Sequence, residues 1–119
     1  MIVQAKELSK TRVIYGNVSN EGLVSNLPDG CVEVACAVDA RGITPMAFGP
    51  LPEQVAALNR AHMAVHELVT QALIERDREK ARHALMLDPL TAAVCSLEEI
   101  DRMFDEMWVA QRADLAAFE

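Results

Sequence analysis

One stretch of nine residues, Cys31–Asp39, limits the folds open to this chain more than any other. Its apolar side chains at positions 32, 34, 36 and 38 alternate with the remaining residues. Successive side chains of an extended backbone point to opposite faces, so this period of two indicates a β-strand with one apolar face. That face must be covered. The only large apolar surfaces that we recognise are the helical patterns after Leu51, so we expect helices to cover the sheet.

Two further strands are expected beside this one. Residues 12–18 are rich in β-branched and aromatic side chains and end in turn-forming residues. A short turn after Asp39 leads into residues 43–49, a third strand that contains Pro45. Proline cannot donate a ladder hydrogen bond, so this strand belongs at an edge or carries a bulge. The pattern predicts a small, mostly antiparallel sheet.

The apolar period changes to three and four residues after Pro52, which predicts an amphipathic helix to about residue 75. Asp77 is placed to cap a second helix that ends near Leu87. Asp88, followed by Pro89, is typical of the start of a short helix, which we expect to reach residue 94.

A capping box marks the start of the last helix. Ser96 and Glu99 have the spacing at which each side chain bonds the other residue's backbone N–H. The apolar stripe that follows continues to Phe118, so we expect a single helix over that length. We therefore predict an α+β protein in which three to four helices cover a small, mostly antiparallel sheet.

A length of 119 residues fits one domain, 1–119. Within it we expect a short helix tail at 1–11, a sheet with hairpins at 12–49 and a helical part at 52–119. The weak helical pattern at 1–11 is too short to be stable alone, which is typical of a helix cut from something larger.

Charge and composition exclude some partners. The net charge is −7 and no basic run is longer than a pair, which argues against nucleic acid and anionic membranes as partners. No apolar segment approaches the roughly 20 residues that a membrane span needs. The cysteines number three, and an odd set is unlike the disulfide framework of a secreted protein. We expect a cytoplasmic protein with reduced thiols.

Histidine and cysteine spacing gives little support for a metal site. His62 and His66 are four residues apart on an expected helix, a spacing at which two imidazoles can share a metal ion. The order that adds a general base, H-E-x-x-H, is absent, and His62 falls on the apolar stripe. Cys31 and Cys36 are five apart on a strand, so they face opposite sides and cannot bind one ion together.

Three residues are candidates for the substrate side of a site. Glu33 lies in mid-strand on the face opposite the valines, where a carboxylate is either solvated or paired across a cleft. Asn17 and Asn20, with Asn26, surround Gly22 and could present amides to a polar ligand such as a sugar. Asparagine is also a common turn residue, which is the simpler interpretation. A glycine-rich phosphate loop and a G-x-S-x-G elbow are both absent.

The last helix has an apolar stripe wider than one partner needs. Its extra width comes from four large side chains: Met103, Phe104, Met107 and Trp108. Exposed apolar patches of a few hundred Å² usually mark an interface. We therefore predict a homo-oligomer built on the sheet, the last helix or both, with Trp108 at least partly buried.

The chain as a whole resembles a known family. The segments that carry the resemblance cover almost the whole chain in order and are RVIYGNV (12–18), GLVSNLP (22–28), VEV (32–34), GITP (42–45), LPEQVAALN (51–59) and MLDPLTAAV (86–94). They are similar to the C-terminal portion of glycoside hydrolase family 4, in its α-galactosidase (melibiase) and α-glucosidase branch. The resemblance implies the fold of the C-terminal half of a lactate or malate dehydrogenase-like enzyme.

The resemblance also implies unusual chemistry, because family members are NAD-dependent and metal-dependent glycosidases outside the two-carboxylate scheme. The sugar is oxidised by NAD, a divalent metal such as manganese acidifies a proton, and the glycosidic bond breaks by elimination. The family's glycine-rich loop, metal ligands and base precede the matching segment. The resemblance therefore implies no catalytic, cofactor-binding or metal-binding residue in this chain. It also implies that the partner of this chain is the N-terminal Rossmann half of the same enzyme, and that the substrate of the full enzyme is a sugar.

Two functions follow as hypotheses. The first is a domain of such a glycosidase, inactive without its Rossmann half. The second is a stand-alone binding or oligomerisation module that has kept the scaffold and lost the chemistry. A strand and glycine-rich loop encoded upstream of Met1 would favour the first.

Overall fold

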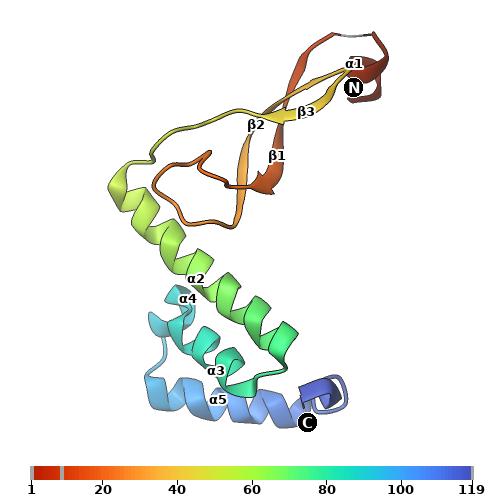
Figure 1. Ribbon diagram of the computed structural model, residues 1–119. Coiled ribbons are helices and arrows are strands. Elements are labelled where there is room, and N and C mark those ends of the chain that lie inside the picture. The colour runs from red at the N-terminus through yellow and green to blue at the C-terminus, as the bar shows by residue number, and fades with distance from the viewer. Residues whose placement is uncertain (1, 9, 119) are drawn as a thin grey trace. The chain divides into compact units, whose positions relative to one another are not determined.

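The computed structural model describes residues 2–8 and 10–118 (Figure 1). The elements in chain order are α1 (Ile2–Leu8), β1 (Arg12–Ser19), β2 (Cys31–Asp39), β3 (Gly42–Pro45), α2 (Glu53–Glu75), α3 (Arg78–Leu87), α4 (Pro89–Ala92), α5 (Leu97–Ala110) and the 3₁₀ turn η1 (Ala116–Phe118). By its internal contacts the chain divides into two units, residues 1–57 and 58–119. Helix α2 begins in the first unit and continues in the second.

The three strands of the first unit form one antiparallel sheet in the order β1-β2-β3. This confirms the predicted sheet and places the proline-containing strand at an edge. The third strand is shorter than the expected 43–49, because it ends at Pro45. One further backbone bond follows, in which the Met46 N–H donates to the Ala35 carbonyl at 2.9 Å.

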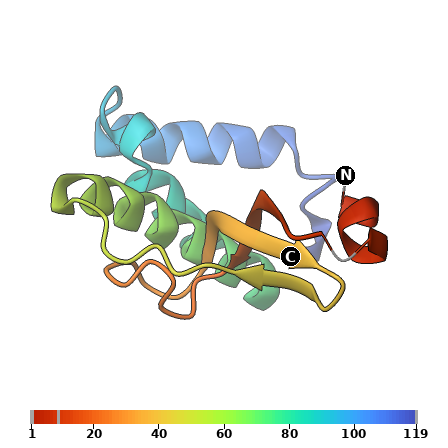
Figure 2. The same cartoon turned by 90° about the horizontal axis from the view of Figure 1, so that it is seen from above.

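The cover of the valine face differs from our expectation. Within the first unit, the buried residues of β2 pack with Val24 and with the half-buried side chains of Leu23, Leu27 and Leu51. Helix α1 lies beside the sheet and also packs against β2 (Figure 1, Figure 2), and its residue Ala5 is buried. The loop between β1 and β2 and helix α1 therefore contribute to the cover, which the sequence predicted from the helices after Leu51. Three apolar residues in the loop between β1 and β2 were overlooked, because that loop has no helical or strand period.

The second unit contains helices with the predicted starts. The side chain of Asp77 accepts from two backbone N–H groups at the start of α3, and that of Asp88 does the same for α4. Ser96 and Glu99 form both halves of the capping box on α5. Helix α3 packs against α4 and α5, with Ala84 among its buried residues. Helix α4 ends at Ala92, before the expected residue 94.

The last helix ends earlier than its apolar stripe predicts. Helix α5 stops at Ala110, and the chain turns through residues 111–115 into η1. This reversal brings the Phe118 ring edge-on to Trp108, with ring centroids 5.3 Å apart. Phe118 therefore contacts Trp108 through a turn and not along a continuous helix.

The described residues form three antiparallel strands and five α-helices, which confirms the predicted α+β class. None of the described helices combines the length and apolar character that a membrane span requires. A single domain over 1–119 stays a prediction.

Candidate functional site

The sheet brings two of the three substrate-side candidates together. Asn17 and Glu33 are directly opposite each other in the β1–β2 ladder, and both are exposed. Opposite residues of an antiparallel pair share a face and have neighbouring Cβ atoms. This is the face turned away from the buried valines. An amide beside a carboxylate can both donate to and accept from sugar hydroxyl groups.

Asn20, the third candidate, has a different position. The residue is 1% exposed, and its side-chain amide bonds to backbone groups of the loop that follows β1. Its Nδ2 donates to the carbonyls of Val24, Leu27 and Pro28 at 3.2, 3.1 and 2.9 Å, and its Oδ1 accepts from the Val24 N–H at 2.8 Å. In the structure, Asn20 therefore holds this loop in shape.

Asn26 ties the same loop to the segment before α2. Its Nδ2 donates to the Leu51 carbonyl and its Oδ1 accepts from the Leu51 N–H, both at 2.9 Å. The Asn26 side chain thus forms the same pair of hydrogen bonds that a neighbouring strand would form, and it joins two segments that are 25 residues apart in sequence. Of the three asparagines near Gly22, only Asn17 presents an exposed side chain.

A hollow of about 300 Å³ lies beside this loop, lined by Val18, Ser19, Glu21, Leu23 and Pro45. Its volume is at the lower end for small-molecule sites. The sequence did not single it out, because its lining residues come from a strand end, a loop and a second strand.

The histidines and cysteines do not combine into a metal centre. His62 and His66 are both exposed on α2. Cys36 is buried, with its Sγ donating to the Val34 carbonyl at 3.4 Å, whereas Cys31 is exposed on the opposite face. Among residues 2–8 and 10–118, no three side chains of His, Cys, Asp or Glu are grouped to hold an ion. The donors in these residues therefore do not fit the divalent metal that the resemblance implies.

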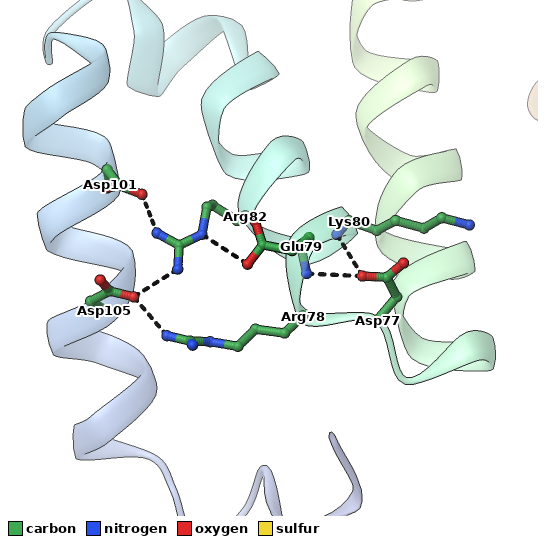
Figure 3. Close-up of polar contacts among 7 residues, drawn as sticks. All are labelled: Asp77, Arg78, Glu79, Lys80, Arg82, Asp101 and Asp105. Atoms are coloured by element: carbon green, nitrogen blue, oxygen red, sulfur yellow. Dashed lines mark hydrogen bonds and ion pairs between the residues drawn. The ribbon is translucent and has the colours of Figure 1, made fainter. Parts of the chain in front are cut away.

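The main polar cluster of the second unit was not predicted. Arg82 of α3 donates to Asp101 and, at 2.9 Å, to Asp105 of α5, while Arg78 donates to Asp105 at 2.6 Å (Figure 3). Arg82 also lies over the Phe104 ring, 4.7 Å from its centroid. Burial opposes the charge of Arg82, but its hydrogen bonds to the two aspartates outweigh this and raise its pKa. These contacts join α3 to α5, so the cluster has a structural role.

The four interface candidates have unequal exposure. Phe104 is 7% exposed and belongs to the core of the second unit. Trp108 is half-buried between the rings of Phe104, at 5.2 Å, and Phe118. Met103 is half-buried, and Met107 is 49% exposed. Trp108 is thus partly covered by its own chain, and Met107 is the most accessible of the four.

Comparison with known proteins gives matches over most of the chain. The sequence profile of the family 4 glycosyl hydrolase C-terminal domain matches residues 1–91. The chain is 41% identical over 110 residues to an alpha-galactosidase of Bacillus subtilis and 37% identical over 111 residues to an alpha-galactosidase of Rhizobium meliloti. Each alignment covers 92% of this chain but only 26% and 23% of the respective relative.

Solved structures agree with the sequence matches. A 6-phospho-alpha-glucosidase from gut microorganisms, in complex with NAD and glucose-6-phosphate, superposes with a TM-score of 0.78 at 26% identity, over 94% of this chain and 25% of that one. A 6-phospho-alpha-glucosidase structure in complex with NAD and Mn²⁺ gives a TM-score of 0.80 at 24% identity, over 93% and 25%, and shows the fold alone. This chain spans about a quarter of the length of these proteins, and by the profile match it belongs to glycosyl hydrolase family 4, as the C-terminal domain.

Proposed function

We propose that this chain is the C-terminal part of an NAD- and divalent-metal-dependent glycosidase that acts on α-galactosides by oxidation and elimination. The observation that carries the proposal is the 41% identity to an alpha-galactosidase over 92% of the chain. On this proposal the NAD and metal sites lie in a Rossmann half of the same enzyme, and in the described residues no three side chains of His, Cys, Asp or Glu are grouped to hold an ion. On this proposal the isolated chain is inactive.

In this enzyme the exposed sheet face is the substrate-side surface. Asn17 and Glu33 lie next to each other on it, and both are accessible. Their amide and carboxylate provide the donors and acceptors that sugar hydroxyl groups need. Asn20 contributes indirectly, because it fixes the loop that leaves β1 close to this pair.

A chimera tests the proposal. In the Bacillus subtilis alpha-galactosidase, the segment that aligns with this chain is replaced by residues 1–119, and hydrolysis of p-nitrophenyl α-galactoside is measured. We expect turnover that needs both NAD⁺ and Mn²⁺ and exceeds that of the truncated relative. The matched control is the chimera with Val34→Asp, which puts a charge in the sheet core. A folded chimera that cleaves another glycoside but no α-galactoside would overturn the substrate assignment.

We also propose that the chain self-associates and works in the cytoplasm. Self-association is supported by large apolar side chains at the surface, among them Val13 and Tyr15 on the exposed sheet face, at 57% and 75% exposure. The three cysteines are all free thiols, which suits a reducing compartment.

A further inference from the structure

The two edges of the sheet are protected to different degrees. The β3 edge has four residues and ends at Pro45, two features by which natural proteins prevent further strand pairing. The β1 edge has eight residues without proline, and its only charged residue is Arg12 at its start. Within residues 2–8 and 10–118, β1 pairs with β2 alone. Among the described residues, the β1 edge therefore has no strand partner on its outer side.

The charges at the two ends of β1 are opposite in sign. Lys10 and Arg12 lie at its beginning, and Glu21 follows its end. All three are exposed, and the ion pairs among the described residues do not involve them. If a second β1 runs antiparallel to the first, the basic end of each strand meets the acidic end of the other. A two-fold axis near the middle of the strand generates both contacts at once.

We propose that two copies of this chain pair antiparallel through their β1 edges, which makes one continuous six-stranded sheet. The two-fold axis passes near Tyr15 or Gly16, in the middle of β1. There a residue of one copy lies opposite the same residue of the other copy, and both side chains are on the same face of the sheet. Lys10 and Arg12 of each copy then lie beside Glu21 of its partner. This inference rests on the self-association proposed above and assigns it to one surface.

Charge reversal tests the pairing by sedimentation equilibrium of the 119-residue chain. Glu21→Lys places like charges together twice in the dimer, and we expect the dimer dissociation constant to rise about tenfold. Glu106→Lys changes the net charge equally at an exposed site on α5 and should leave the constant within about twofold. Far-UV circular dichroism confirms that each variant is folded.

Mixing two variants of opposite charge should restore the dimer that each variant loses alone. The double variant Lys10→Glu, Arg12→Glu should also dissociate alone, but an equimolar mixture with Glu21→Lys restores attraction at both ends and should dimerise. A wild-type chain that is monomeric at tens of micromolar overturns self-association and the pairing with it. A wild-type dimer that Glu21→Lys leaves as tight as before overturns the β1 edge alone and points to another interface, such as the surface around Met107.

Discussion

Replacing Asn20 with alanine separates a structural role from a ligand-binding one. The substitution removes the side-chain amide of a residue that is 1% exposed; its two N–H hydrogens are shared among three carbonyls, and its Oδ1 accepts from one N–H. Each such bond contributes about 0.5–1.5 kcal/mol, and a buried donor left without an acceptor costs about 1–3 kcal/mol. The Val24 N–H is that donor, because its acceptor is Asn20 Oδ1. We expect the free energy of unfolding to fall by about 3 kcal/mol, a large part of the 5–15 kcal/mol typical of a domain.

Urea unfolding followed by far-UV circular dichroism measures this effect. For an m-value of about 1.5 kcal/mol/M, a loss of about 3 kcal/mol lowers the midpoint by about 2 M. Asn17→Ala is the matched control, since Asn17 is exposed and should change stability by no more than about 0.5 kcal/mol. A midpoint for Asn20→Ala that stays within about 0.3 M of wild type would refute the assignment of Asn20 to the loop.

Three further predictions concern the caps, the last turn and the cofactors. The Thr91 hydroxyl, then backbone N–H groups, lower the pKa of Asp88 below its usual value, so its contribution to stability is full above the unfolded pKa and is lost as the pH falls through the folded pKa. Asp88→Ala should therefore lower the thermal midpoint at pH 7, and its difference from wild type should shrink as the pH falls through the folded pKa. Phe118→Ala removes the ring that covers Trp108 and should shift the Trp108 emission to longer wavelength, whereas unchanged emission would contradict the contact. Calorimetric titration of the isolated chain with NAD⁺ or Mn²⁺ should give no saturable heat, and micromolar binding of either would contradict the absence of those sites from this segment.

The sequence predicted the elements that follow local rules. The alternation in β2 identified a strand, because only an extended backbone gives its side chains a period of two. Asp77, Asp88 and Ser96 marked helix starts, because an N-cap bonds backbone groups within three residues of itself. These features could be predicted because each depends on neighbours in sequence.

The features that the sequence did not reveal depend on distant contacts. Asn20 reads as a turn residue, and its burial arises only when the loop folds back over it. The end of α5 at Ala110 was missed, because Phe118 continues the apolar stripe although it reaches Trp108 by a turn. Arg82 counts as polar in any hydrophobic pattern, yet it covers the Phe104 ring and joins α3 to α5.

Strand β1 contributes to two surfaces at the same time, the exposed face of the sheet and its free edge. Its side chains leave roughly perpendicular to the sheet, whereas its free backbone groups lie in the plane of the sheet. The Asn17 side chain can therefore stay exposed beside Glu33 while the N–H and C=O groups of the same strand bond a second copy. A dimer built on this edge would hold two substrate-side faces in one continuous sheet. It follows that charge reversal at Glu21 should change assembly without removing the Asn17–Glu33 pair, although Glu21 also lines the hollow beside the loop.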